Sequence, residues 1–314
     1  MDKIYLPIIV GPTASGKTKL GVELAKIFDG EIVSCDSMQI YKGMDIATAK
    51  PTQEEMQNVK HHLISVIEPS ERFSVADYKV LADKAILDIN SREKMPIMVG
   101  GTGLYADTVA DNITFSENET DFELREKLNK ICEEKGKTYM HEWLERIDMQ
   151  TANELHENNI GRVIRAIEVY EQTGIPISVH KKNSKLQKTP YNPCFIGLDF
   201  EDRSVLHERI NKRVDEMLKN GLIEEAKTAY QNHSENSTSI QAIGYKELIP
   251  YFEGKADLDE SIDLIKLRTR QYAKRQLTWF RKNDRINRIF VDKYSNFNDI
   301  LEIAKKYIEK SKVL

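Results

Sequence analysis

Cysteine and long apolar runs are scarce in this sequence. Only three cysteines occur among the 314 residues, Cys35, Cys132 and Cys194, and none belongs to a CxxC pair or a metal-type spacing. This scarcity is typical of a reducing compartment and argues against structural zinc. The apolar residues 1–10 run directly into a glycine loop, and no uninterrupted stretch approaches the roughly 18 apolar residues that a membrane span needs. We therefore expect a cytoplasmic protein that does not contact a membrane.

The chain also lacks a strong overall charge, because its formal net charge at pH 7 is −4. This sum hides a local excess at residues 266–288, where nine basic residues face one acid, Asp284, and nine minus one gives a net charge of +8. A polyanion can dock on such a segment while the rest of the surface stays mildly acidic. The basic residues are Lys266, Arg268, Arg270, Lys274, Arg275, Arg281, Lys282, Arg285 and Arg288.

Short apolar runs recur along the chain. Those that predict buried parallel strands are residues 4–10, 32–34, 63–67, 97–99, 195–198 and 289–291. Helical patterns separate most of them, and this alternation predicts an α/β fold with a doubly wound parallel sheet. Ligands of such folds bind at the carboxyl ends of the strands, so we expect the functional site at that edge.

One stretch, residues 114–184, breaks the alternation because it has helix periodicity and hardly any strand signal. We interpret it as an inserted all-helical lobe. The predicted division is a first core part at 1–113, the lobe at 114–190, and the core completion with a basic helical C-terminal region at 191–314. Ser204 is expected to cap a helix. The expected apolar stripes are Leu124, Leu128 and Ile131; Ile160, Val163, Ile164, Ile167 and Tyr170, before Gly174 and Pro176; and Leu206, Ile210 and Val214.

A glycine loop follows the first expected strand and opens the next expected helix. It fits the pattern G-x-x-x-x-G-K-[ST] of a phosphate-binding P-loop, with the residues Gly11, Pro12, Thr13, Ala14, Ser15, Gly16, Lys17 and Thr18. Its backbone N–H groups and the helix N-terminus attract phosphate oxygens, Lys17 adds a cation, and Thr18 is expected to hold Mg²⁺. The sheet is therefore expected to be of the P-loop NTPase type. Kinases, GTPases, ATPases and other transferases share this loop, so it leaves the reaction open.

Two further loops are expected at the same edge of the sheet. Asp36 follows the strand at 32–34, where its carboxylate either accepts a proton from an attacking group, caps the next helix or orders a water on Mg²⁺. A second glycine loop, Gly100–Tyr105, follows the strand at 97–99 and permits close approach of a ligand to the backbone. Thr102 in this loop either donates a hydrogen bond to the bridging oxygen of a diphosphate leaving group or belongs to a simple tight turn.

With these three loops in view, the sequence resembles the bacterial tRNA dimethylallyltransferases, also called tRNA isopentenyltransferases. The resemblance spans nearly the whole chain. The segments that carry it are GPTASGKT at 11–18, DSMQIYKGMDIATAKP at 36–51, HHLI at 61–64, VGGTGLY at 99–105, RVIRAIEV at 162–169, QAIGYKE at 241–247 and TRQYAKRQLTWFR at 269–281.

This resemblance implies Mg²⁺-dependent transfer of the dimethylallyl group from dimethylallyl diphosphate to the exocyclic N6 amine of the adenosine 3′-adjacent to the tRNA anticodon. Asp36 matches the family's proposed base, while Lys17, Thr18 and Thr102 would help Mg²⁺ to neutralise the leaving diphosphate. The adenosine must flip out of its stack to reach the site. The stretch that would hold the target base is Asp36, Ser37, Met38 and Gln39.

The resemblance also implies that the helical lobe and the basic segment grip an anticodon stem-loop through its phosphates and shape. Arg162 and Arg165 are alternatively solvated helix charges, and the pair Arg209 and Arg213 more often only solubilises a helix. Gly244 alternatively forms a turn with no role beyond packing. Besides residues 36–39 and Thr102, the residues expected to contact tRNA are Arg125, Gly161, Arg162, Val163, Ile164, Arg165, Gln241, Gly244, Lys274, Arg275 and Arg281.

Three other functions stay open from the residues alone. An adenylate isopentenyltransferase would have the same loops but a free nucleotide as acceptor, and the helical insertion and the basic segment favour RNA over it. A small-molecule kinase is predicted by the P-loop alone, although a GTPase is not, because the chain has no Asn-Lys-x-Asp loop. The third is an RNA-binding protein without catalysis. A monomer would suffice for any of these functions.

Overall fold

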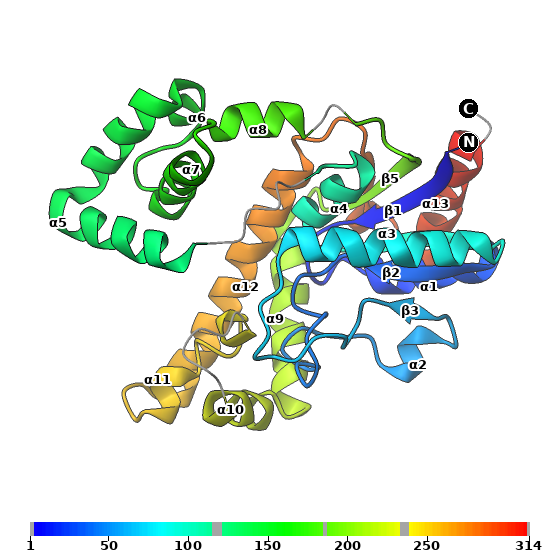
Figure 1. The fold of residues 1–314 in the computed structure, drawn as a ribbon. Helices are drawn as coiled ribbons and strands as arrows, with labels where there is room; N and C mark the ends of the chain where they lie inside the picture. The colour runs from blue at the N-terminus through cyan, green and yellow to red at the C-terminus, as the bar shows by residue number, and fades with distance from the viewer. Residues whose placement is uncertain (1–2, 115–120, 185–186, 233–238, 313–314) are drawn as a thin grey trace. The chain divides into compact units, whose positions relative to one another are not determined.

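Two compact units make up the chain. The computed structural model in Figure 1 describes residues 3–114, 121–184, 187–232 and 239–312. One unit consists of residues 1–110 and 189–314, and the other of residues 111–188. None of the helices within the described ranges is long and apolar enough to cross a membrane.

A single parallel sheet forms the centre of the larger unit. It has six strands in the order β3-β2-β4-β1-β5-β6, and every paired neighbour runs parallel. The predicted doubly wound α/β fold is confirmed. Because β2, β4 and β1 are adjacent, the loops that follow these three strands meet at one edge of the sheet. The strands are β1 (Ile4–Val10), β2 (Gly30–Ser34), β3 (His61–His62), β4 (Met95–Gly100), β5 (Tyr191–Asp199) and β6 (Asn287–Phe290).

The strand predicted at residues 63–67 is wrong, although the other five predicted strands overlap observed ones. Strand β3 ends at His62, because Leu63 and Ser65 have left-handed φ values of 63° and 53°, which no β-strand tolerates. Only Ile67 returns to an isolated bridge, with Tyr41. The apolar run therefore packs as a loop against the core and not as a strand.

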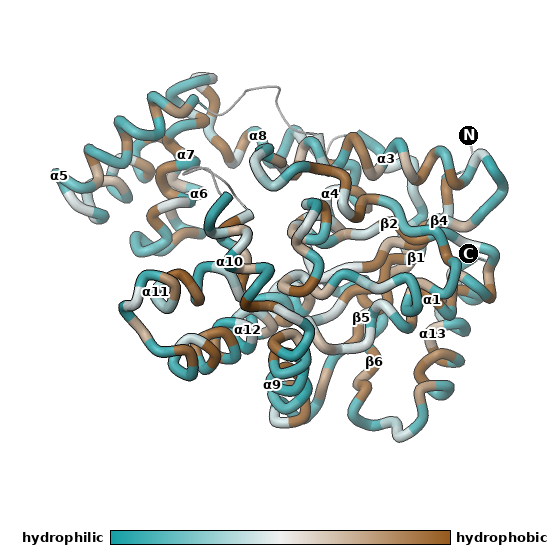
Figure 2. The backbone as a smooth tube through the Cα atoms, turned by 90° about the horizontal axis from the view of Figure 1, so that it is seen from below, coloured by the Kyte–Doolittle hydropathy of each residue, from teal (hydrophilic) through white to brown (hydrophobic). Residues whose placement is uncertain are grey.

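Helices cover both faces of the sheet. Ile8 of β1 packs into the core on the side of α3 and α4, whereas its neighbour Ile9 packs into the core on the side of α1 and α13. Successive side chains of a strand point to opposite faces, so a continuously apolar strand is buried on both sides. Figure 2 shows α3 and α4 above the strands and α13 below them. The covering helices are α1 (Lys17–Ile27), α3 (Val75–Ser91), α4 (Gly103–Ala110) and α13 (Phe297–Lys312).

The remaining helices of this unit follow β5 or lie in the connection after β2. In α9 the predicted stripe of Leu206, Ile210 and Val214 is buried, which confirms it. The predicted cap, Ser204, is wrong by two residues: the Asp202 side chain accepts a hydrogen bond from Ser204 N at 2.8 Å and caps the helix. The elements are α2 (Gln53–Met56), α9 (Arg203–Lys219), α10 (Leu222–Asn232), α11 (Ile249–Phe252), α12 (Leu258–Phe280) and the 3₁₀-helices Ser239–Gln241 and Val291–Lys293.

In its described residues the smaller unit has helices and connecting loops but no strand, and it has a core of its own. Leu128, Val163 and Ile167 from the predicted stripes are buried in this core. Helix α7 ends at Thr173, just before Gly174, whose φ of 68° suits glycine, and Pro176 follows, as predicted. The helices are α5 (Phe122–Ile147), α6 (Met149–Glu154), α7 (Ile160–Thr173) and α8 (Ile177–Asn183).

A buried carboxylate joins β2 to its neighbours at the start of the strand that leads to Asp36. Glu31 accepts a hydrogen bond from Arg92 Nη2 at 2.8 Å and contacts His62 Nε2 at 2.7 Å. The hydrogen bonds from Arg92 lower the pKa of Glu31 to about 2. The charge of Glu31 therefore stabilises this part of the fold.

We expect Glu31→Gln to lower the free energy of unfolding by about 2 kcal/mol at pH 7, because about 1.4 kcal/mol accompanies each pKa unit and the half-exposed Arg92 weakens the pair. The folded-state pKa lies below that of an unfolded glutamate, so the stabilisation is complete above about pH 5 and is lost as the pH falls toward 2. Urea unfolding should show the variant–parent difference shrinking between pH 5 and pH 3. Glu302→Gln, at an exposed position of α13, is the control, and an equal Glu31→Gln effect at both pH values would contradict the assignment.

Candidate functional site

The P-loop lies between β1 and α1, as predicted, in a conformation suited to an anion. Ala14 and Gly16 have left-handed φ values of 61° and 89°, which turn the loop back on itself. No side chain of the described residues caps the N-terminus of α1, so its first backbone N–H groups stay available. Ser15 Oγ is buried and has no hydrogen-bond partner within the described ranges. A phosphate oxygen is the ligand that such unsatisfied donors fit.

Two cations and one carboxylate interact electrostatically at this loop. Lys17 Nζ donates a hydrogen bond to Pro12 O at 2.8 Å. Burial and the positive charge of Arg213 lower the pKa of Lys17 to about 8, while the charge of Asp36 acts in the opposite direction. Burial likewise lowers the pKa of Arg213, again against the charge of Asp36. Neighbouring cations that are partly removed from water favour an anionic ligand, which would relieve their repulsion.

Arg213 was predicted to be a solubilising surface charge like Arg209, and for Arg213 this prediction is wrong. Its side chain is partly buried, and Nη2 donates to Ala49 O at 3.4 Å. Arg209 is exposed, with its guanidinium 5.3 Å from the centroid of the Phe200 ring. The signal was present in the spacing, because Arg213 comes seven residues after Leu206 and three after Ile210 and so lies near the buried stripe of α9.

Asp36 lies in the turn after β2, and one of its oxygens caps that turn. Oδ1 accepts hydrogen bonds from Met38 N at 3.0 Å and Gln39 N at 3.4 Å. The capping alternative therefore describes Oδ1. The described residues make no hydrogen bond to Oδ2, which leaves that oxygen for chemistry. The side chain of Asp36 is half-buried, together with those of Ser37, Met38 and Gln39.

The second glycine loop interlocks with the Asp36 turn. Thr102 N donates to Cys35 O at 3.1 Å, and Thr102 Oγ1 accepts from Ser37 N at 3.0 Å. A Cβ atom on Gly100 would lie 2.3 Å from Cys35 O, so only glycine allows this approach. Burial raises the pKa of the Cys35 thiol, which suits a packing residue and not a nucleophile. Asp36 and Thr102 are thereby brought together, as predicted.

Gln276 of α12 connects the P-loop to the second glycine loop, and sequence reasoning missed it. Its Oε1 accepts from Thr13 N at 2.9 Å, and its Nε2 donates to Gly101 O at 2.9 Å. The side chain is buried, and a Cβ atom on Gly101 would lie 2.2 Å from Nε2. The only sequence signal for Gln276 was its place in the segment 269–281, which carries part of the family resemblance. Both polar atoms of this amide are satisfied, so the side chain acts as a rigid bridge between the loops.

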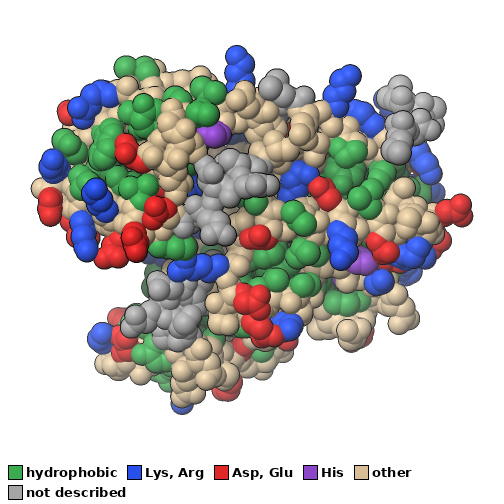
Figure 3. All heavy atoms as spheres, in the orientation of Figure 1, with side chains coloured by type: hydrophobic (Ala, Val, Ile, Leu, Met, Phe, Trp, Pro, Cys, Tyr) green, Lys and Arg blue, Asp and Glu red, His purple; other side chains and the backbone are tan. Residues whose placement is uncertain are grey.

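Helix α12 carries both site residues and exposed cations. Burial and the charge of Asp36 raise the pKa of Tyr272, whose side chain also interacts with Thr102. The guanidinium of Arg275 lies 5.6 Å from the Tyr272 ring centroid, and both Arg275 and Lys274 are exposed. Arg281, just beyond the helix, is exposed as well. On the face shown in Figure 3, Lys and Arg side chains are interspersed with Asp and Glu side chains.

The predicted tRNA contacts of the smaller unit divide into exposed and buried residues. Gly161 and Arg162 are exposed at the start of α7, whereas Val163 and Ile164 are core residues. The side chains of Val163 and Ile164 therefore pack and are not presented to a ligand. Arg125 and Arg165 are half-exposed and pair with the buried Glu168: Arg125 Nε donates to it at 3.0 Å, and Arg165 Nη1 lies 3.0 Å from its Oε1.

Two more predicted tRNA contacts lie in the segment 241–247 of the larger unit. Gln241 is exposed. Gly244 is buried with a φ of 102°, and its N–H donates to Glu247 Oε2 at 2.8 Å. Gly244 thus shapes a turn, which agrees with the packing alternative for this residue.

Among the described residues, no group of three or more His, Cys, Asp or Glu side chains could hold a metal ion. Thr18, at the second position of α1, is half-buried, and its hydroxyl would offer Mg²⁺ the kind of hard oxygen ligand that this ion takes. The donor set therefore fits a hard cation that arrives with its anionic ligand.

These features define a P-loop α/β enzyme whose phosphate-binding loop lies at the same edge of the sheet as a carboxylate. A family model described as IPP transferase matches residues 39–283. A tRNA dimethylallyltransferase of Caldanaerobacter subterraneus is 48% identical over 97% of this chain and 98% of its own. A crystal structure of the tRNA isopentenylpyrophosphate transferase from Bacillus halodurans has a TM-score of 0.73 and 43% identity, covering 99% of this chain and 98% of its own. A eukaryotic dimethylallyltransferase acting on tRNA has a TM-score of 0.80 and 30% identity over 98% of this chain and 80% of its own. The chain belongs to the IPP transferase family.

We expect Arg213→Gln to weaken binding of inorganic diphosphate by about ten- to a hundredfold, because a charge-assisted hydrogen bond contributes roughly 1.5–3 kcal/mol. Isothermal titration calorimetry with Mg²⁺ present measures this change. Arg209→Gln, on the same helix but exposed, should bind like the parent. Equal affinities for the two variants would remove Arg213 from the diphosphate site.

Proposed function

We propose that this chain transfers the dimethylallyl group from dimethylallyl diphosphate to the N6 amine of the adenosine 3′-adjacent to the anticodon in tRNA, releasing diphosphate. The observation that carries the proposal is the meeting of three loops on adjacent strands: the P-loop after β1, the Asp36 turn after β2 and the Thr102 loop after β4. Gln276 bridges the first of these to the third. The P-loop and a carboxylate thus lie at one edge of the sheet, which supports a reaction that needs both an anion site and a base.

The P-loop serves the leaving group in this reaction. As N6 attacks carbon 1 of the dimethylallyl group, the bond between that carbon and the diphosphate oxygen breaks, and its electron pair goes to the diphosphate. Lys17, Arg213 and the N–H groups of the P-loop stabilise the charge that develops there. Thr18 would hold Mg²⁺, which supplies further positive charge when bound. Thr102 would donate a hydrogen bond from its hydroxyl to the bridging oxygen.

Asp36 takes the proton that the amine loses. The lone pair of an adenine N6 is delocalised into the ring, so removal of its proton must accompany bond formation to carbon. Two backbone N–H groups hold Oδ1 of Asp36, which favours the anionic carboxylate and orients it. The second oxygen, Oδ2, then accepts the N6 proton.

The target adenosine enters the site as a flipped base. Ser37, Met38 and Gln39 line the turn beside Asp36 and are half-buried, so they can contact the base once it leaves its stack. Extrusion costs a few kcal/mol and is least costly in a loop. This explains why an anticodon loop, and not a duplex, is the acceptor.

The exposed basic residues would hold the RNA around that loop. In the larger unit the exposed Lys274, Arg275 and Arg281 offer phosphate contacts, and Gln241 offers a polar one. In the smaller unit Gly161 and Arg162 are exposed at a helix start, and Arg125 and Arg165 are half-exposed. A monomer suffices for this arrangement, and a cytoplasmic location is part of the proposal.

We expect labelled dimethylallyl diphosphate to label unmodified tRNA, and Asp36→Asn to reduce kcat by about 100-fold or more while tRNA affinity stays within about threefold of the parent. The reason is that the variant keeps an oxygen for the turn and loses the base. Nucleoside analysis of the product identifies N6-dimethylallyl adenosine, and filter binding measures affinity. A tRNA with guanosine in place of the target adenosine is the control.

Other outcomes of the same assay would identify the competing functions. Label that appears only in AMP or ATP would make the chain an adenylate isopentenyltransferase. Consumption of ATP with transfer of its terminal phosphoryl would make it a kinase. Unchanged turnover in Asp36→Asn would leave the transferase activity in place and remove Asp36 as the base.

We expect Arg275→Ala to weaken tRNA binding about evenly across sequences and to reduce the slope of log K against log salt by about one, because one phosphate contact releases about one counterion. Fluorescence anisotropy across a series of salt concentrations measures the slope. Lys306→Ala, at an exposed position of α13, should keep the parent slope. Arg275 has no phosphate contact if its variant also keeps that slope.

A further inference from the structure

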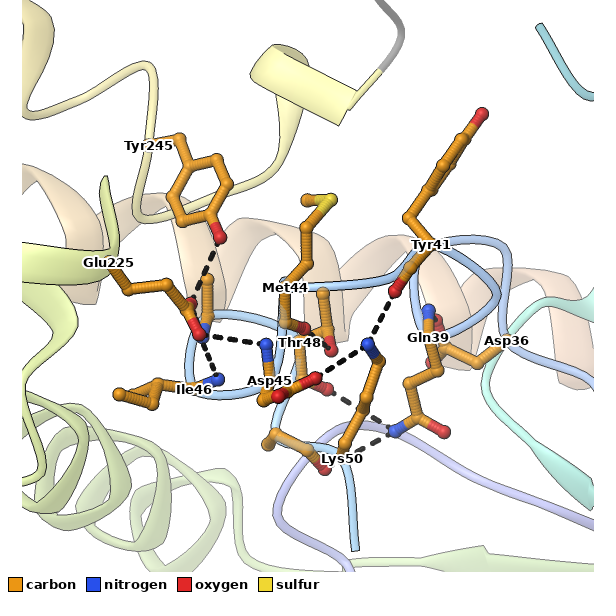
Figure 4. Close-up of polar contacts among 12 residues, drawn as sticks. Asp36, Gln39, Tyr41, Met44, Asp45, Ile46, Thr48, Lys50, Glu225 and Tyr245 are labelled. Carbon is orange, nitrogen blue, oxygen red and sulfur yellow. Dashed lines mark hydrogen bonds and ion pairs between the residues drawn. The ribbon is translucent and has the colours of Figure 1, made fainter. Parts of the chain in front are cut away.

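Glu225 of α10 binds three consecutive backbone N–H groups of a distant loop. Its Oε2 accepts hydrogen bonds from Asp45 N and Ile46 N, both at 2.8 Å, and its Oε1 accepts one from Ala47 N at 2.9 Å (Figure 4). Tyr245 OH donates a fourth, at 3.0 Å to Oε1. A run of successive N–H groups forms an anion-binding concavity, and here a side chain of the same unit fills it. Glu225 and Asp45 are 180 residues apart in the sequence, so this contact belongs to the tertiary structure.

The loop bound by Glu225 in turn holds a residue of the site. Gln39 Nε2 donates to Thr48 O and to Ala49 O, each at 3.2 Å. Ser34 Oγ donates to the amide oxygen of Gln39 at 3.3 Å, so both ends of that amide are fixed. Arg213 Nη2 reaches the same carbonyl of Ala49, at 3.4 Å. The loop 43–50 thus lies between Glu225 and two residues of the site.

Packing on α10 and a salt bridge within the loop support its conformation, but they do not replace the carboxylate. Met44 is buried with Leu222 and Tyr245 in the core on this side of the sheet. Lys50 Nζ lies 2.7 Å from Asp45 Oδ1 and also bonds Tyr41 O. These contacts leave the three N–H groups to Glu225, and without that acceptor the donors would have to find other partners. Glu225 is thus the acceptor for all three backbone N–H groups of residues 45–47.

We propose that Glu225 is a positioning residue for the transfer reaction: through the 43–50 loop it sets the place of the Gln39 amide beside the target adenine. The proposal rests on the proposed function. Tyr245 adds a link from the same carboxylate to the segment 241–247, in which Gln241 is exposed. One carboxylate thereby fixes two segments that would face the acceptor.

The test compares Glu225→Gln with Glu224→Gln, its exposed neighbour on α10. Glutamine keeps the length of the side chain but replaces one acceptor by an NH₂ group that faces a backbone donor. We expect kcat/KM for tRNA to fall about 10- to 100-fold in Glu225→Gln, as for other supporting residues, with the KM for dimethylallyl diphosphate within about threefold of the parent. Glu224→Gln should match the parent in both.

Amide hydrogen exchange of residues 44–48 is the second readout. It should quicken in Glu225→Gln and stay at the parent rate in Glu224→Gln. Glu225→Asp keeps the charge and should recover part of the lost kcat/KM. Circular dichroism shows whether Glu225→Gln is folded at the assay temperature. If it is not, Glu225→Asp is used in its place. The proposal is overturned if Glu225→Asp, with its shorter side chain, keeps both the exchange rates and the kinetics of the parent.

Three results would overturn the positioning role while the proposed function stands. They are parent kcat/KM for tRNA in Glu225→Gln, unchanged exchange of residues 44–48 in an active Glu225→Gln, or a loss that falls equally on the KM values of both substrates. A parent enzyme that transfers no label to tRNA would instead refute the proposed function, and with it the kinetic role of Glu225.

Discussion

The site depends on the close approach of three backbone segments at the carboxyl edge of the parallel sheet. Strands β2, β4 and β1 are neighbours, so the turn at Asp36 and the loop at Thr102 lie near enough to exchange hydrogen bonds through Cys35 O and Ser37 N. Gly100 permits this contact because any side chain there would collide with the Cys35 carbonyl. Backbone packing therefore sets the relative positions of Asp36 and Thr102.

Electrostatics at the same edge prepares the site for an anion. Burial lowers the pKa values of Lys17 and Arg213, the charge of Arg213 lowers that of Lys17 further, and Asp36 offsets part of these effects. Two cations and one carboxylate leave an excess of positive charge where the P-loop directs its N–H groups. In the proposed reaction a diphosphate leaving group would meet this excess of positive charge, and Asp36 belongs to the turn that would receive the adenine. One arrangement would thus serve both the leaving group and the nucleophile of the proposed reaction.

Helix α12 and the loop 43–50 extend this arrangement outward. The buried Gln276 ties the P-loop to the Gly101 loop, while Lys274 and Arg275 on the same helix are exposed to solvent. Glu225 orders the 43–50 loop, whose carbonyls hold Gln39. Gln276 and Glu225 thus hold the segments that carry the proposed substrate contacts. Such support restricts the movement of these segments away from a productive geometry.

Sequence alone determined the elements whose signals are local: the P-loop, strand β1, the glycine loop after β4 and the apolar stripe of α9, because each rests on spacing within a few residues. The tertiary structure decided what depends on distant partners. Gln276 meets Thr13 across 263 residues, Arg213 turns inward to the Ala49 carbonyl, and Leu63 and Ser65 leave the predicted strand. Periodicity reports which face of an element is apolar, but it does not report which polar group from elsewhere in the chain will meet that face. Long-range packing sets those pairs.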